Sequence, residues 1–77
     1  MEFNIRIRSF GDVQEFIRLA TTQPFRVFLG NDYQSANATS YMGLVSLDHS
    51  HPLRVSADCG EEEFKRFRQQ AARFFAE

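Results

Sequence analysis

The residues with the clearest chemical potential lie in the stretch 35–47, where hydroxyl side chains precede a short apolar run. Thr39 and Ser40 can accept hydrogen bonds from the free backbone N–H groups of a helix that begins near Tyr41. The same N–H groups and the helix dipole favour negative charge, so a phosphate on a serine here would be well tolerated. Taken alone, these residues fit either a capped core helix or a site of serine modification.

Both histidines of the chain, His49 and His51, lie in the stretch 48–52, which proline and polar residues mark as a loop. An alternating pair can place two imidazoles on one side of an extended segment, but only Asp48 offers a further ligand nearby. Closed metal sites need more ligands, so we predict no metal site and expect solvent-exposed side chains. The chain also lacks a glycine-rich phosphate loop and a Gly-x-Ser-x-Gly elbow, so neither an enzyme nor a cofactor site is predicted.

A third group of candidates consists of arginines that alternate with apolar residues in segments typical of strands: Arg6, Arg26 and Arg54. On one face of a sheet they would form a basic stripe that could bind nucleic acid, although open sheet faces are routinely polar. The formal net charge is −1, which supplies no general attraction to nucleic acid or to anionic lipid. A nucleic-acid-binding module is therefore the least favoured function.

The elements that position these residues follow from the hydrophobic pattern, which has the period of strands in some segments and of helices in others. Strands are predicted at 2–7, 25–29, 33–36 and 53–57, and helices at 12–22, 41–47 and 61–77. The spacing of Asp12 and Glu15 is that of a capping box opening the first helix. The order β-α-β-β-α-β-α favours an α+β fold, with one face of an antiparallel sheet covered by helices.

Length and composition indicate a single domain over residues 1–77, with a packed core supplied by a hydrophobic fraction of 43% and nine phenylalanines. The single cysteine, Cys59, excludes an intramolecular disulfide and fits a reducing cytosol. No apolar stretch approaches the roughly 20 residues of a membrane span. We therefore expect a soluble cytoplasmic protein.

The stretch 35–47, together with this element order, resembles the HPr family of phosphocarrier proteins from the bacterial sugar phosphotransferase system. The match reads Ser35-x-Asn37-x-x-Ser40-x-Met42-Gly43-x-x-Ser46-Leu47. The resemblance extends in weaker form from Val13 to Phe75. It implies an HPr-like open-faced β-sandwich with strand order 1-4-2-3 and three helices on one side. In the family the first serine of the short second helix is the regulatory phosphorylation site, and Ser40 holds that position here.

The sequence departs from the family at the carrier site. HPr proteins transfer phosphate through a histidine at the start of the first helix, in a loop that also holds an arginine and a proline. The corresponding stretch, residues 8–13, contains Arg8 but no histidine and is several residues shorter. Because arginine is no substitute for an imidazole nucleophile, ordinary carrier activity is not expected. The alternative is a phosphocarrier with another acceptor, for which only His49 and His51 are available.

By the same resemblance, the start of the first helix, the short second helix and the loop after it form the docking surface for enzymes and regulators. These segments contribute Phe10, Tyr41, Met42, Val45 and His49. The implied partners are phosphotransferase enzymes, HPr kinase or a transcriptional regulator. The first hypothesis is therefore a non-catalytic regulatory or protein-interaction module in bacterial carbon metabolism, modified at Ser40.

Overall fold

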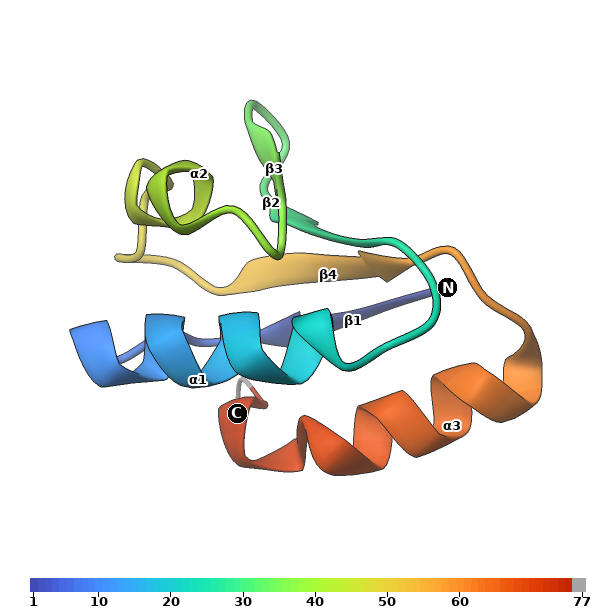
Figure 1. Ribbon diagram of the computed structural model, residues 1–77. Coiled ribbons are helices and arrows are strands. Elements are labelled where there is room, and N and C mark those ends of the chain that lie inside the picture. The colour runs from blue at the N-terminus through green and yellow to red at the C-terminus, as the bar shows by residue number, and fades with distance from the viewer. Residues whose placement is uncertain (76–77) are drawn as a thin grey trace.

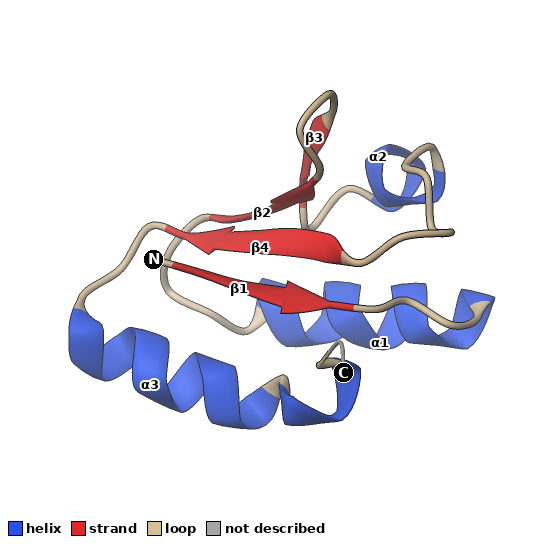
Figure 2. Ribbon diagram, turned by 180° about the vertical axis from the view of Figure 1, so that it is seen from behind, coloured by secondary structure: helices blue, strands red, loops and turns tan. Residues whose placement is uncertain are grey.

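The structure is a computed structural model that describes residues 1–75. Its strands are β1 (Glu2–Ile5), β2 (Val27–Gly30), β3 (Ser35–Asn37) and β4 (Leu53–Ala57), and its helices are α1 (Phe10–Thr21), α2 (Tyr41–Val45), α3 (Glu61–Gln70) and the 3-10 turn η1 (Ala72–Phe74). All strand pairs are antiparallel, in the order β1-β4-β2-β3. The long helices α1 and α3 lie on the same side of the sheet (Figures 1 and 2). The predicted α+β fold and strand order are confirmed.

The core lies between the sheet and the two long helices. In β4 the alternate residues Leu53 and Val55 have no exposed surface, while Arg54 between them is half-buried. Phe67 of α3 is also fully buried, and its ring centroid lies 5.6 Å from that of Phe3. Strand alternation and helical spacing therefore direct their apolar side chains into one shared layer.

Helix α1 begins earlier than predicted because its cap is Ser9 rather than Asp12. The Ser9 Oγ accepts a hydrogen bond from the Asp12 backbone N–H at 3.2 Å. Asp12 lies in the first turn, and its carboxylate accepts a hydrogen bond from the Arg8 backbone N–H at 3.0 Å. Asp12 thus takes the acidic first-turn position expected of Glu15, but its carboxylate bonds to the N–H of Arg8, one residue before the cap, rather than to the Ser9 N–H as in a capping box.

The predicted helix over 61–77 is wrong after Gln70, where α3 gives way to η1. The Arg6 N–H donates to the Phe74 carbonyl at 2.7 Å, and Phe75 forms an antiparallel bridge with Ile5. A continuing helix could not make these contacts, which satisfy backbone groups beside the edge strand β1. Residues 76 and 77 of the predicted helix lie outside the described residues.

The predicted strands differ from the observed ones mainly in their ends. The prediction placed the third strand at 33–36, but Tyr33 and Gln34 form the turn instead. Their backbone N–H groups both donate to the Asn31 side-chain oxygen at 2.8 Å, an arrangement typical of asparagine in turns. β1 ends at Ile5 rather than at residue 7, and β2 starts at Val27 rather than at residue 25.

The shorter strands also change the predicted basic stripe. Of its members only Arg54 lies in a strand, since Arg6 follows β1 and Arg26 precedes β2. Arg54 pairs with Asp32 at 2.8 Å, and the Glu2 carboxylate accepts a hydrogen bond from the neighbouring Ser56 hydroxyl at 3.2 Å. Acidic side chains therefore lie beside the arginines, and the predicted basic stripe is not continuous.

Within the described residues, no helix combines the length and the apolar character needed to cross a membrane.

Candidate docking site

Ser40 lies at the start of α2, as the sequence predicted, and caps the helix. Its backbone is extended, and its Oγ accepts a hydrogen bond from the Gly43 N–H at 3.2 Å. The residue is exposed. The hydroxyl is therefore accessible at the surface while it satisfies one of the free N–H groups of the helix.

The residues around Ser40 form a tight connection from β3 to α2. The Asn37 side chain accepts hydrogen bonds from the Thr39 N–H at 2.9 Å and from the Thr39 hydroxyl at 2.7 Å. A Cβ atom at Gly43 would lie 3.0 Å from the Ala36 Cβ and 3.1 Å from the Ser40 Oγ. Asparagine and glycine at these positions therefore allow α2 to pack closely against β3.

Four apolar side chains from α1 and α2 are exposed near Ser40: Phe10 (62%), Tyr41 (39%), Met42 (76%) and Val45 (38%). We call these four residues the docking face. The rings of Phe10 and Tyr41 are 5.8 Å apart between centroids, so the two helices contribute to one surface. The structure thus places together four of the five residues predicted to bind a partner. The sequence around α2 is also uncharged, since no charged residue occurs between Asp32 and Asp48.

His49, the fifth predicted residue, is half-buried rather than solvent-exposed. Its Nε2 lies 2.7 Å from the Leu44 carbonyl oxygen. Because a carbonyl only accepts, Nε2 carries a proton, and in the neutral ring Nδ1 is then the acceptor nitrogen. Nδ1 is buried and has no hydrogen-bond partner among the described residues. His51, by contrast, is exposed.

The loop that holds the histidines contains an acidic residue with a perturbed pKa. The Ser50 hydroxyl donates to the Asp48 carboxylate at 2.6 Å and the Ser50 N–H at 3.0 Å. These hydrogen bonds lower the pKa of Asp48, since they favour the charged form. No group of three or more histidine, cysteine or acidic side chains within residues 1–75 could hold a metal ion.

A pocket of about 310 Å³ opens beside the docking face, between the segment after β1 and the end of α2. Its walls are Ile7, Arg8, Ser9, Phe10, Val13, Val45 and His49. Phe10 and Val45 belong to both the pocket and the docking face. The pocket was not predicted from the sequence, because Ile7 and Val13 were recognisable only as apolar core positions.

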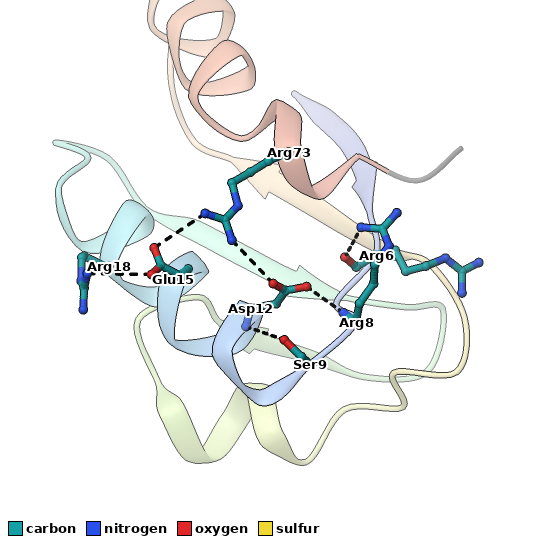
Figure 3. A network of polar contacts seen from close by, with 7 residues as sticks. All are labelled: Arg6, Arg8, Ser9, Asp12, Glu15, Arg18 and Arg73. Carbon is teal, nitrogen blue, oxygen red and sulfur yellow. Dashed lines mark hydrogen bonds and ion pairs between the residues drawn. The ribbon is translucent and has the colours of Figure 1, made fainter.

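The first turn of α1 is held by a network of polar contacts, which Figure 3 shows. Arg73 of η1 lies 3.7 Å from the Asp12 carboxylate and 4.0 Å from that of Glu15. The Arg8 guanidinium donates to the Arg6 and Phe75 carbonyls, each at 3.4 Å. The C-terminal segment thus fixes the strand-to-helix connection that forms one wall of the pocket.

Comparison with known proteins gives the fold. No protein-family profile matches the chain, and no curated protein matches its sequence. Among solved structures, HPr-C-His from Thermoanaerobacter tengcongensis superposes with a TM-score of 0.73 at 22% identity, covering 100% of this chain and 97% of that one. The chain has an HPr-like fold. At this identity the likeness concerns the fold alone. At the start of α1 the present protein has the residues Arg8, Ser9 and Phe10.

Proposed function

We propose that this HPr-like chain is a non-catalytic regulatory module that binds a partner protein through the docking face, with phosphorylation of Ser40 as its switch. The observation that carries the proposal is the group of exposed apolar side chains around an exposed, helix-capping serine. By the resemblance, the partners are phosphotransferase enzymes, HPr kinase or a transcriptional regulator in the cytoplasm of a bacterium.

The chemistry of the docking face supports protein binding. Aromatic residues and methionine are enriched in the centres of protein interfaces, and charged residues are depleted there. The docking face contains Phe10 of α1 and, from α2, Tyr41 and Met42, which lie in a stretch without charged residues from 33 to 47. Met42 is the most exposed of these side chains, at 76%. Contact with a partner would remove this apolar area from water.

The start of α1 supports a role without phosphate transfer through histidine. The Ser9 hydroxyl occupies the cap of α1 and accepts the Asp12 N–H there. His49, the histidine nearest the docking face, donates from Nε2 to a carbonyl, and its Nδ1 is buried. His51 is exposed, so it is the more accessible acceptor if the alternative phosphocarrier function holds.

Phosphorylation of Ser40 would change the character of the docking face. A phosphoserine carries about −1.5 to −2 charges near neutral pH. Placed beside Tyr41 and Met42, this charge would have to be desolvated when an apolar partner surface binds. A partner that recognises the unmodified face would then be released, whereas a partner with an arginine cluster would be recruited.

Treatment with HPr kinase and ATP, followed by peptide mapping by mass spectrometry, tests the switch. We expect a single phosphate on the peptide that contains Ser40, which the variant Ser40→Ala lacks. The matched control Ser46→Ala changes a serine at the other end of α2, where the hydroxyl donates to the Gly43 carbonyl at 2.8 Å. It should keep the modification. No phosphate at Ser40, under conditions that label a standard HPr, would refute this part of the proposal.

A further inference from the structure

We propose that the edge strand β3 pairs antiparallel with β3 of a second copy of this chain, so that two four-stranded sheets join into one. The contact is made by backbone groups of residues 33–37. This surface does not include the docking face, and the pairing does not depend on whether Ser40 is modified.

The two edges of the sheet differ in how they are protected. At β1 the C-terminal segment covers the edge, where Phe75 forms an antiparallel bridge with Ile5. β3 lies at the opposite edge (Figures 1 and 2), and within residues 1–75 no further strand pairs with its outer side. Proteins often protect such an edge with charged side chains or proline, but the stretch 33–47 contains neither. The edge at β3 is therefore open to another strand.

The hydrogen bonds between β3 and β2 use the backbone of alternate residues. Directly after β3, the Ala38 N–H donates to the Val27 carbonyl at 2.8 Å. Bonded and non-bonded pairs alternate in an antiparallel ladder, so Ala36, two residues earlier, is the β3 residue that bonds to β2. Ser35 and Asn37 occupy the non-bonded pairs. Their backbone N–H and C=O groups therefore point away from β2, toward the open edge.

The groups on the open edge are self-complementary. The Asn37 carbonyl already accepts a hydrogen bond from the Ser40 N–H at 2.9 Å, which leaves the Asn37 N–H and both backbone groups of Ser35. When a twofold axis relates two copies at Ser35, each Ser35 N–H can donate to the Ser35 carbonyl of the other copy. One residue thus supplies both halves of a bonded pair, and a second copy satisfies it.

The surroundings of Ser35 also suit a second copy. Tyr33, Ser35 and Asn37 are exposed. In the twofold pairing Tyr33 of one copy lies opposite Asn37 of the other, so the Tyr33 side chain, 94% exposed in the single chain, contacts the neighbouring strand. Identical charged surfaces repel each other, but the stretch 33–47 is uncharged and the adjoining Asp32 pairs with Arg54 at 2.8 Å.

The proposal predicts weak, concentration-dependent dimerisation. Because β3 has only three residues, the interface is small, and we expect a dissociation constant on the order of 10⁻⁴ M. Sedimentation equilibrium over about a hundredfold range of concentration around this value measures it. The mass should rise from the 9.0 kDa of one chain toward that of two. In 15N-labelled protein the amide signals of Ser35 and Asn37 should shift over the same range, and those of α3 should not.

Charge substitutions at the twofold axis test the register. Ser35→Lys and Ser35→Glu each place like charges opposite one another, so each variant should dimerise up to about fivefold more weakly than the wild type. An equimolar mixture should associate more tightly than either variant alone, because opposite charges then meet. The matched controls Gln14→Lys and Gln14→Glu, at an exposed position of α1, should show neither effect.

A proline variant tests the backbone contact itself. Ser35→Pro removes an N–H that points away from β2, so it should abolish dimerisation and leave the bonds between β2 and β3 in place. Thermal unfolding verifies that this variant and the charge variants are folded.

Several results would overturn the proposal. They are a mass that stays at one chain over the whole range, Ser35 variants that dimerise as the wild type does, and a mixture that gains nothing. A dimer that Met42→Asp abolishes and Ser35→Pro keeps would place the contact on the docking face instead. Labelling of Ser40 by HPr kinase is measured separately, so a failure of the proposed switch and a failure of dimerisation are distinguishable.

Discussion

At the scale of single residues, serine side chains begin both α1 and α2. Ser9 and Ser40 each accept a hydrogen bond from a backbone N–H in the first turn, at 3.2 Å in both cases. The cap at Ser40 was predictable because polar residues directly precede an apolar run. The cap at Ser9 was not, because Asp12 offers an equally suitable side chain in the same turn, and only the backbone conformation decides between them.

The cap at Ser9 leads to a stability prediction. Ser9→Ala should lower the free energy of unfolding by about 1 kcal/mol, because the Asp12 N–H loses its side-chain acceptor. Ser9→Asn supplies an equivalent oxygen and should restore most of the loss. Urea unfolding followed by circular dichroism measures both. Equal stability of the alanine variant and the wild type would contradict the assigned cap.

The hydrogen bonds from Ser50 to Asp48 predict a pH dependence. Because they lower the pKa of Asp48 in the folded state, the carboxylate contributes stability above its unfolded pKa of about 3.9. That contribution is lost as the pH falls through the folded value. Asp48→Asn should therefore be less stable than the wild type at pH 7, and the difference should shrink below about pH 4. A difference that grows on acidification would contradict the assignment.

Among the candidate site residues, Tyr41, Met42 and Val45 could be placed on one short helix from the sequence, whereas the pocket that Val45 shares with Phe10 and His49 could not. Tyr41, Met42 and Val45 follow one another along a short amphipathic helix, so their proximity is a local property. The pocket joins Arg8 to His49, which are distant in sequence and meet only through the packing of α1 against α2. Side-chain directions across two elements are not encoded in the local pattern of either one.

At the scale of elements, the end of α3 shows where periodicity misleads. Phe67, Ala71 and Phe74 keep a helical spacing, and all three are buried. The backbone nevertheless turns at Ala71, because Phe74 and Phe75 bond to the edge of β1 and to the residue after it. The competing hydrogen bonds come from the other end of the chain, so no local pattern reveals them.

The β2–β3 hairpin depends on a glycine at its closing end. A Cβ atom at Gly30 would collide with the Gln34 carbonyl oxygen and lie 2.7 Å from the Ser35 Cα. Gly30→Ala should therefore cost about 1–3 kcal/mol of stability.

The matched control is Gly11→Ala, which lies inside α1, where an added Cβ meets only the Ser9 Oγ at 3.7 Å. It should stabilise by about 0.5–1 kcal/mol, because alanine is the better helix former. Thermal unfolding of the two variants measures both changes in stability, which should be opposite in sign. A Gly30→Ala protein as stable as the wild type would contradict the close approach.

At the scale of the whole molecule, a cluster of phenylalanines joins the sheet to both long helices. Phe67 lies at its centre, with ring centroids 5.6 Å from Phe3 of β1, 6.4 Å from Phe16 of α1 and 5.6 Å from Phe25. Such aromatic pairs contribute beyond the area they bury. The cluster explains how a chain of 77 residues obtains a sufficient core.

Removal of the Phe67 ring should strongly destabilise the protein. Phe67→Ala should destabilise the protein by about 3–5 kcal/mol, because it leaves a cavity in contact with three elements. Phe28→Ala is the matched control, since Phe28 is 37% exposed and should cost less. Denaturant unfolding of both variants compares their losses of stability. Similar losses of stability would mean that Phe67 is not the centre of the core.

The fold as a whole was predictable because most local signals agreed with it. The hydrophobic pattern indicates one buried face in each element, by alternation in β1 and β4 and by the stripe of Val13, Phe16 and Ala20 on α1. The family resemblance added the strand order. The HPr-like topology then places the start of α1 beside α2, which brings Phe10 and Tyr41 together. The remaining errors concern element ends, where competing caps and hydrogen bonds differ little in energy.

The central claim is that this HPr-like protein binds a partner rather than carries phosphate on a histidine. Incubation with enzyme I, phosphoenolpyruvate and magnesium, with a standard HPr as positive control, tests it most directly. We predict that the standard becomes phosphorylated and that this chain acquires no acid-labile phosphate. An acid-labile phosphoprotein that disappears in His51→Ala or His49→Ala would contradict the account and establish a working carrier.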